Sequence, residues 1–401
     1  MTSKNSLRFA LNTELLCGQS VHRELPGLIA SFAKSVLLLI DENVSSIEPV
    51  SFLRNELEKQ GLALNEILLR GTEEPDYDYL DEVSLQARDL PCDLVIAIGG
   101  GSALDLSKAV SILLTNPGSG LDYRGFDMVQ VPGIPLMAIP TTAGTASEVT
   151  VNAVFTNKNE KKKLGINGAF MNARYAVLDP HFTSSAPQEV AVSAGVDAMV
   201  HVLESFVTSN APATNYTFAQ RQNSNLVTKT FAREAFSLLY HNLPALIEDP
   251  QNMERLLNIQ LGAYYAGISL FNSGSGIAGA MSYPLGVHYK IPHGICGGMF
   301  ALPVVRYNVA NGFYDYQALH DLIEDADLSL DPQSKCDRFI ELMQELFDSL
   351  KVPDSLVQFG VGPDSYEHVL EIMQGMQGAF DQNPVPLKTE DADILLKPFF
   401  K

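Results

Sequence analysis

Three short, almost wholly apolar runs in the first half of the chain constrain its fold more than any other feature. They are residues 35–40 (SVLLLI), 93–98 (DLVIAI) and 134–139 (IPLMAI). A strand that is apolar at nearly every position has both faces covered, which is typical of a parallel sheet flanked by helices. Residues 50–61 and 102–114, between these runs, carry apolar side chains at helical spacing. The alternation predicts an α/β region with a mostly parallel sheet.

The pattern changes after about Pro187, where helical spacing dominates and hardly any alternating segment is found. We expect helices over residues 188–209, 227–247, 253–270, 334–351 and 365–376. A chain of 401 residues exceeds one comfortable core, and the Ser/Pro turn at 184–187 is a suitable junction. The sequence therefore predicts an α/β domain over residues 1–186 and an all-helical domain over residues 187–401.

Charge and cysteine content narrow the class of protein. The chain has 47 acidic and 27 basic residues and a net charge of −20, which repels phosphate backbones and anionic lipids, so we expect neither nucleic acid nor membrane as a partner. Its four cysteines form no CxxC pair, which indicates reduced thiols in a cytoplasmic protein. Cys296, close to His293, is interpreted as a small buried residue rather than a soft metal ligand. We find no signal-peptide core and no apolar run long enough to span a bilayer.

A glycine-rich loop follows the second apolar run directly. It reads Gly99-Gly100-Gly101-Ser102 and leads into a predicted helix with Asp105. Consecutive glycines allow close approach of the backbone to a ligand, and the N–H groups at a helix start attract an anion such as pyrophosphate. The alternative is a tight strand-to-helix turn. The dinucleotide fingerprint GxGxxG is absent, so an ordinary Rossmann motif does not account for the loop.

A polar loop follows the third apolar run. Thr141, Thr142, Thr145 and Ser147 offer hydroxyls for phosphate or ribose oxygens, although such clusters also cap helices and fill turns. Open α/β sheets bind ligands in the crevice formed by loops at the carboxyl ends of their strands. The two polar loops together therefore indicate a dinucleotide-binding site. Asp41, at the end of the first run, is suited to ribose hydroxyls and would repel a 2′-phosphate, which favours NAD; aspartate is also common in loops.

The candidate metal ligands are Asp197 and His201, one helical turn apart, and His293 in Pro292-His293-Gly294. A carboxylate with two imidazoles is the ligand set of a catalytic zinc or iron(II) site with an open position. The alternative is a hydrogen-bonded Asp–His pair bridging helices. Glu204 lies on the same line of the predicted helix, beside an apolar stripe. Surface or capping positions are expected for His22, His181, His241, His320 and His368, and a solvated turn for residues 161–163.

In combination these motifs resemble the iron-containing (metal-dependent) alcohol dehydrogenase family. The resemblance rests on Gly99–Ser102 with Asp105 and Lys108, residues 140–145, Gly195-Val196-Asp197 with His201, Pro292-His293-Gly294, and Asn383-Pro384. It covers nearly the whole chain in order. It implies an NAD(P)-binding α/β domain, a helical domain and a metal in the cleft between them, in a dehydroquinate synthase-like architecture.

The resemblance also implies roles for particular residues. The glycine loop would hold the pyrophosphate, Asn152 would face substrate and nicotinamide, and the cofactor site would be lined by Thr141, Thr142, Thr145, Lys163 and Leu178. The substrate would be a small alcohol or aldehyde. We expect a homodimer or larger homo-oligomer.

One departure from the family pattern concerns the metal. The family normally has two histidines, at i and i+4, before Pro-Leu-Gly; the first is a metal ligand and the second lies near substrate and cofactor. This sequence has Gly279 and Tyr283 at those positions. Three protein ligands suffice for a catalytic zinc, although affinity should fall. Tyr283 is a candidate proton relay, and His288 either compensates for the missing ligand or is a surface residue. Ala146 replaces a frequent glycine.

The leading hypothesis is an NAD-dependent oxidoreductase that interconverts an alcohol and an aldehyde or ketone by metal-assisted hydride transfer. The second is a metal-poor nucleotide-binding relative without dehydrogenase activity, which acts as a binding or assembly subunit. A lyase of the dehydroquinate synthase type is a weaker third, because the helical half is poor in the Lys/Arg clusters that a substrate phosphate requires.

Overall fold

The first part of the chain forms one parallel sheet. The computed structural model describes residues 7–71, 75–160, 162–209 and 223–400. Its larger sheet has six strands in the order β1-β9-β6-β4-β2-β3, and every neighbouring pair is parallel. The strands are β1 (Glu14–Cys17), β2 (Ser35–Asp41), β3 (Ala63–Leu69), β4 (Leu94–Gly99), β6 (Leu136–Pro140) and β9 (Tyr175–Leu178). The three apolar runs of the sequence are therefore strands β2, β4 and β6.

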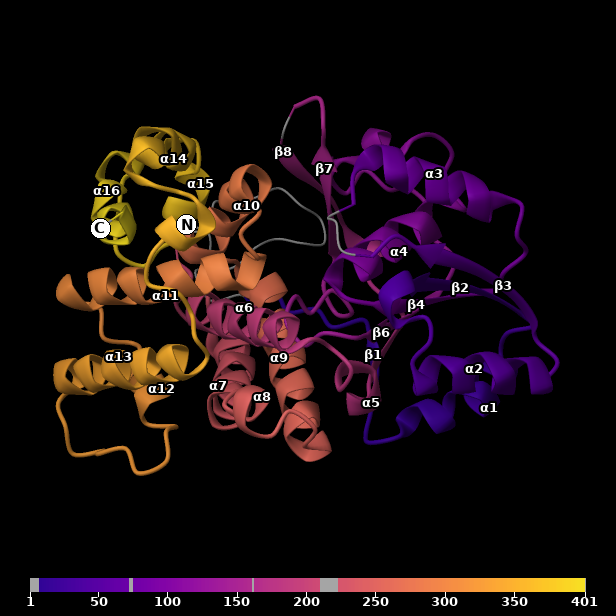
Figure 1. The fold of residues 1–401 in the computed structure, drawn as a ribbon, viewed down its shortest axis with the longest axis horizontal. Coiled ribbons are helices and arrows are strands. Elements are labelled where there is room, and N and C mark those ends of the chain that lie inside the picture. Colours follow the sequence, from indigo (N-terminus) through magenta and orange to yellow (C-terminus); the bar gives the residue numbers. More distant parts are fainter. Residues whose placement is uncertain (1–6, 72–74, 161, 210–222, 401) are drawn as a thin grey trace.

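Helices pack on both faces of this sheet (Figure 1). They are α1 (Leu25–Ala30), α2 (Glu48–Lys59), α3 (Tyr77–Arg88), α4 (Gly101–Leu113) and α5 (Pro180–Thr183). Along β2, Leu37 and Leu39 belong to the core shared with α3 and α4. The intervening Val36 and Leu38 belong to the core shared with α1 and α2. Both faces are covered, which is why the strand is apolar throughout.

A small second sheet projects beside α4 (Figure 1). It has the order β5-β8-β7, with strands β5 (Gly125–Phe126), β7 (Asn152–Asn157) and β8 (Lys162–Asn167). The expected turn at residues 161–163 is wrong for Lys162 and Lys163, which begin β8 and pair antiparallel with β7; Lys161 lies outside the described residues. Lys162 is exposed, as expected of a charged run, but pairing with β7 makes the segment a strand rather than a turn.

The second part of the chain is helical, as expected. Its α-helices are α6 (Gln188–Val207), α7 (Leu226–Asn242), α8 (Ala245–Glu248), α9 (Met253–Ser273), α10 (Ile277–Tyr289), α11 (His293–Ala310), α12 (Gln317–His320), α13 (Pro332–Ser349), α14 (Tyr366–Gln374), α15 (Gln377–Phe380) and α16 (Asp393–Leu396). The sequence did not predict α10 and α11, because each contains an internal proline, Pro284 and Pro303, and several glycines. The single helix expected over 227–247 divides into α7 and α8.

Helix α6 is the centre of the helical part and packs against α7, α9, α10 and α11. Among the described helices, α6 alone is long and apolar enough to cross a membrane, by length and composition. However, 72% of its apolar stretch is buried inside the protein. The expectation that no such segment exists is therefore wrong by composition, because a buried core helix is as apolar as a membrane span. Its stripe of Val196, Met199 and Leu203 lies in the main core.

Candidate functional site

A long cleft lies where the chain changes direction across the sheet. The next strand in the chain after β2, β3, lies on one side of β2 in the sheet, and the strand after that, β4, lies on its other side. Open α/β sheets bind ligands where the strand order reverses in this way, beyond the carboxyl ends of the strands. The cleft has a volume of about 810 Å³. It is lined by Asp41, Asn43, Tyr79, Gly100, Gly101, Ser102, Thr141, Thr142, Thr145, Ser193, Asp197, Pro292 and His293, among others.

The glycine loop at the start of α4 is packed too tightly for side chains at two positions. A Cβ at Gly101 would lie 2.6 Å from Thr145 Oγ1, and one at Gly99 would lie 2.6 Å from the Cβ of Ala103. Gly100, the N-cap of α4, has no side-chain cap, and a Cβ there would meet Thr142 Oγ1 at 3.5 Å, an ordinary van der Waals contact. The N-terminus of a 13-residue helix therefore points into the cleft, which suits an anionic group.

Asp105, one turn into α4, and Lys108, two turns in, form hydrogen bonds with the segment that follows the threonine loop. Lys108 is buried and donates to the carbonyl oxygens of Ser147, at 3.0 Å, and Asn152. Asp105 accepts from Ser147 Oγ at 2.5 Å and from the backbone N–H of Val154 at 2.8 Å, and lies 3.2 Å from Lys108 Nζ. Burial lowers the pKa of Lys108, and Asp105 opposes this shift.

A second cavity, of about 240 Å³, continues the cleft toward the helical part. The two share Pro75, Gly101, Ser102, Thr145, Asp197 and His293 as lining residues. The second cavity is also lined by Asp105, Ser147, Thr150, Asn152, Lys163, His201, Leu270 and Tyr283. The predicted nucleotide loops and the predicted metal ligands therefore lie along one continuous space.

The three candidate metal ligands converge on the carboxylate of Asp197. Its Oδ1 is 3.6 Å from Nε2 of His201 and 3.7 Å from Nε2 of His293. These separations exceed a hydrogen bond. They are close to the roughly 3.3–3.6 Å between two ligands of a tetrahedral ion with bonds of about 2.0–2.2 Å. The three donor atoms do not all lie within 4.8 Å of one another, so the two imidazoles would have to approach each other to share one ion. Carboxylate plus two imidazoles is also a suitable donor set for zinc or iron(II), so these residues fit a divalent ion with an open position.

Packing between α6 and α11 creates this convergence. A Cβ at Gly294 would lie 1.9 Å from the carbonyl oxygen of Ser193 and 2.8 Å from the Cβ of Asp197. Only glycine permits the two helices to approach this closely, which places the preceding His293 opposite Asp197. The Pro-His-Gly triplet thus has a steric explanation: proline precedes the helix and glycine fits the contact.

Gly279, at the position of the missing ligand, lies against a buried carboxylate. Its N–H donates to Glu204 Oε1 at 2.8 Å, so Glu204 binds the first turn of α10. A Cβ at position 279 would lie 2.9 Å from Glu204 Oε2, and this oxygen is buried without a hydrogen-bond partner. Burial raises the pKa of Glu204, opposed by the N–H of Gly279. Glu204 and Gly279 line neither of the two cavities described above.

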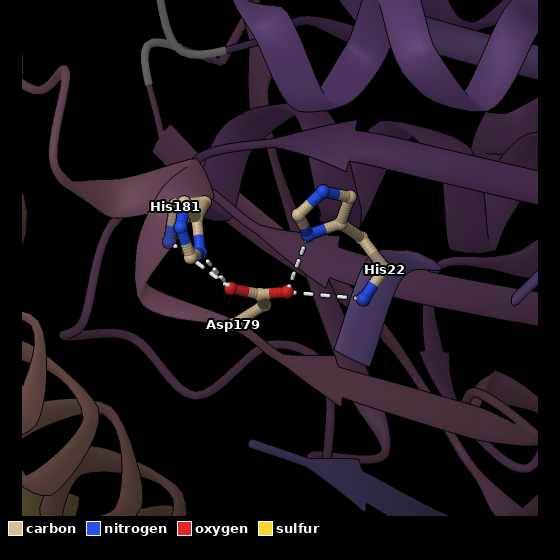
Figure 2. Close-up of side chains that lie close together, drawn as sticks. All are labelled: His22, Asp179 and His181. Atoms are coloured by element: carbon tan, nitrogen blue, oxygen red, sulfur yellow. Dashed lines mark hydrogen bonds and ion pairs between the residues drawn. The ribbon is translucent and has the colours of Figure 1, made fainter. Parts of the chain in front are cut away.

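A second Asp–His–His group lies at the end of β9 (Figure 2). Nδ1 of His22 and Nδ1 of His181 lie 2.6 and 2.8 Å from Oδ2 and Oδ1 of Asp179. Within the described parts of the chain, these residues form the one group of three metal-ligand side chains whose donor atoms all lie within 4.8 Å of one another. The short separations are those of hydrogen bonds and are too small for ligands sharing an ion. We therefore interpret the group as a hydrogen-bonded network.

Two of the histidine expectations are wrong, and one of them concerns this network. His22 is fully buried, as is His320 on α12, whereas surface or capping positions were expected for both. His22 is held inside by the backbone: its own N–H and that of Ser20 also donate to Asp179, at 3.0 and 3.2 Å. A carboxylate 157 residues away in sequence supplied the partner, and no local pattern contains that information.

Three residues predicted to lie in the site, Gly99, Leu178 and His288, line neither cavity. Leu178 is fully buried in a cluster with Ala146 and Tyr264, because its side chain points into the interface between sheet and helices. His288 is exposed and stacks edge-on against His368 of α14, with ring centroids 5.3 Å apart. At about 100° per residue, a position five residues beyond Tyr283 lies about 140° around the helix, away from the cavity.

Sequence reasoning did not single out several lining residues. Pro75, which precedes α3, Tyr79, in the first turn of α3, and Leu270, from α9, line the cavities. Thr150 and Thr156 also line the second cavity. Proline, leucine and threonine are common throughout the chain, so only the tertiary packing identifies them as lining residues.

Comparisons with known proteins agree with this arrangement. Residues 12–180 match the family profile "Iron-containing alcohol dehydrogenase", and residues 191–399 match "Fe-containing alcohol dehydrogenase family, C-terminal". The chain is 26% identical to long-chain-alcohol dehydrogenase 1 of Geobacillus thermodenitrificans over 378 residues, which cover 92% of this chain and 90% of the relative. It is 28% identical to the NAD-dependent methanol dehydrogenase of Bacillus methanolicus over 276 residues, 69% of each chain.

The fold is also found among solved structures. That of a 1,3-propanediol oxidoreductase superposes with a TM-score of 0.88 and 24% identity, covering 98% of this chain and 100% of the other. Two profiles that together span nearly the whole chain, on a matching architecture, leave one assignment: the chain belongs to the iron-containing alcohol dehydrogenase family.

Proposed function

We propose that this protein is an NAD-dependent alcohol dehydrogenase that interconverts an alcohol and an aldehyde or ketone with a bound divalent metal. The observation that carries the proposal is the continuity of the two cavities, which share Asp197 and His293. A dinucleotide whose pyrophosphate lies at the start of α4 would extend its nicotinamide toward these residues. The similarity to an NAD-dependent methanol dehydrogenase and a long-chain-alcohol dehydrogenase supports the same chemistry.

The cleft supports NAD over NADP. Asp41, at the end of β2, lines the cleft and would accept hydrogen bonds from ribose hydroxyls while repelling a 2′-phosphate. Arg70, the nearby cation, is paired with Glu82 at 2.6 Å and lies over the ring of Tyr79. Its charge is thus already compensated by a carboxylate. We propose that Gly100, Gly101, Ser102, Thr141, Thr142 and Thr145 contact the cofactor directly, whereas Gly99 and Asp105 support the loops that do so.

Asp197, His201 and His293 would hold the metal, iron(II) as in the family's name or zinc. When bound, such an ion polarises the substrate oxygen and favours its deprotonated form. Asn152 and Lys163, in the same cavity, would contact substrate and nicotinamide, and the hydroxyl of Tyr283 is the candidate proton relay. His288 and Leu178 are not kept in this assignment, because neither lines a cavity. A homo-oligomer, a cytoplasmic location and a domain boundary at residues 186/187 remain predictions from the sequence.

Cofactor titration of the purified protein tests the proposal. The fluorescence of NADH itself should report saturable binding, and an alcohol panel with NAD should yield NADH. Gly101→Ala should weaken NADH binding at least tenfold, because the added methyl would collide with Thr145. Gly27→Ala, where a Cβ meets nothing within 4 Å, is the matched control. No NAD(H) binding at millimolar concentration would refute the proposal.

Gly279 motivates a second candidate function, a nucleotide-binding subunit that retains the cleft but has lost the metal. Metal analysis separates the two. A stoichiometric divalent ion that disappears in an Asp197→Ala variant supports the enzyme. NADH binding without any metal uptake or turnover supports the subunit.

A further inference from the structure

Tyr283 packs its ring against one of the candidate metal ligands. The ring centroids of Tyr283 and His293 are 4.9 Å apart with an interplanar angle of 66°, an edge-to-face arrangement. Both side chains line the cavity that also contains Asp197 and His201. Lys163 Nζ lies 5.0 Å from the same tyrosine ring. Tyr283 thus contacts the imidazole from α10, whereas His293 is carried by α11.

His293 is the candidate ligand in greatest need of such a contact. Its side chain is 28% exposed, against 11% for His201 and 6% for Asp197. Gly294 fixes where its backbone lies, but a partly exposed imidazole at the first position of a helix is less restricted in its rotamer than a buried one. Holding that rotamer in the metal-binding orientation costs conformational entropy unless packing restricts it beforehand.

We propose that Tyr283 is a positioning residue for the metal site: its ring holds His293 toward Asp197 in a site that lacks the ligand expected at position 279. This inference rests on the proposed metal-binding function. It assigns the ring, rather than the phenol hydroxyl, to metal affinity. Edge-to-face aromatic pairs are favourable beyond their burial, and groups that orient a ligating histidine typically change metal affinity about 10- to 100-fold.

Metal affinity in the absence of turnover tests this assignment. The full-length protein is stripped with a chelator and titrated with Co²⁺, with a competing chromophoric chelator giving the Kd and the visible ligand-field spectrum reporting coordination. Tyr283→Met fills similar space without a ring, and Tyr283→Phe keeps the ring without the hydroxyl. Tyr289→Met is the matched control, since Tyr289 lies on the same helix but lines neither described cavity.

The expected pattern is a Kd for Co²⁺ raised about tenfold in Tyr283→Met, with an altered ligand-field spectrum, and a near-normal Kd and spectrum in Tyr283→Phe and Tyr289→Met. Circular dichroism and the melting temperature verify folding. If Tyr283→Met does not fold, Tyr283→Phe decides alone: a weakened Kd would overturn the inference, because only the hydroxyl is missing.

The other outcomes also decide the matter. An unchanged Kd in folded Tyr283→Met would overturn the positioning role while leaving the metal site and the proposed function intact. A wild-type protein that binds no Co²⁺ would refute the metal-dependent function itself, and the positioning role with it. The two failures are therefore distinguishable.

Discussion

The protein contains two groups of one aspartate and two histidines, and they differ in spacing. Around Asp179, the carboxylate-to-imidazole distances are 2.6 and 2.8 Å. Around Asp197 they are 3.6 and 3.7 Å. The first group is closed by direct hydrogen bonds (Figure 2). The second leaves room for an ion between the same three functional groups.

The two groups also differ in their surroundings, since one is closed by further hydrogen bonds and the other faces open space. Asp179 accepts hydrogen bonds from the backbone N–H groups of Ser20, His22 and His181 in addition to the two imidazoles. Burial by itself would raise the pKa of this carboxyl, but the hydrogen bonds hold it well below its usual range. The Asp197 group faces two cavities. Composition alone therefore does not define a metal site. The spacing of the donor atoms and access from a cavity do.

Removing the carboxylate should affect metal binding and activity in the Asp197 group but folding stability in the Asp179 group. The larger effect is expected at Asp197. Asp197→Ala should lose bound metal and reduce kcat/KM by at least about 1000-fold, because a ligand and its charge disappear. Metal analysis and steady-state kinetics with NAD provide the measurement. A variant that keeps stoichiometric metal would place the ion elsewhere in the molecule.

Asp179→Asn should instead affect stability. Replacing a buried, multiply bonded carboxylate leaves donors from three residues poorly paired, and such changes cost about 3–5 kcal/mol. Urea unfolding gives the difference. Metal content per folded molecule should not change; its loss in Asp179→Asn would show that the closed group, rather than the Asp197 group, holds the ion.

Restoring the absent histidine should make the open group more like that of its family. We expect Gly279→His to tighten Co²⁺ or Zn²⁺ binding about 10-fold or more by adding a fourth ligand. The obstacle is Glu204 Oε2, 2.9 Å from the new Cβ, and it lies at the end of a flexible side chain. Ala280→His on the same helix is the control. Equal affinities for both variants would indicate that position 279 does not face the ion.

The smallest expected effect is on how the free energy of unfolding changes with pH under acidic conditions. Asp179 has a lowered pKa in the folded state, so its stabilising contribution is present above the unfolded value of about 3.9 and is lost as pH falls below it. Urea unfolding between pH 6 and pH 3 should show wild-type stability falling more steeply than that of Asp179→Asn. Parallel profiles would mean that Asp179 does not titrate differently in the folded and unfolded states.

Much of the fold could be predicted because its causes are local. Apolar runs at residues 35–40 and 93–98 indicated buried parallel strands, and the helical spacing of residues 188–209 indicated α6, since strand and helix periods are properties of short segments. Helices α10 and α11 were missed because Pro284, Pro303 and several glycines have low helix propensity, which packing against α6 and against each other overrides.

The candidate site could be predicted only in part. Gly101 and Thr145 were identified from motifs that follow strands, and the structure places them in contact. Leu178 was assigned by resemblance, and His288 was a candidate replacement for the missing ligand with a surface position as the alternative. Both lie outside the cavities, and His288 is exposed, because the direction of a side chain depends on the rotation of its element against its neighbours. The contact between Tyr283 and His293 joins two helices and has no signature in either segment.

The sequence by itself determined strands β2, β4 and β6, long helices such as α4, α6, α9 and α13, the two loops at the strand ends and the candidate ligands Asp197, His201 and His293. Tertiary structure alone decided which aspartate–histidine group is open and which is closed. It also decided that Glu204 lies against Gly279 and that Tyr283 packs on His293. The physical reason is distance: whether an imidazole and a carboxylate share a hydrogen bond or flank an ion depends on about one ångström, and that ångström is set by the packing of residues far apart in the chain.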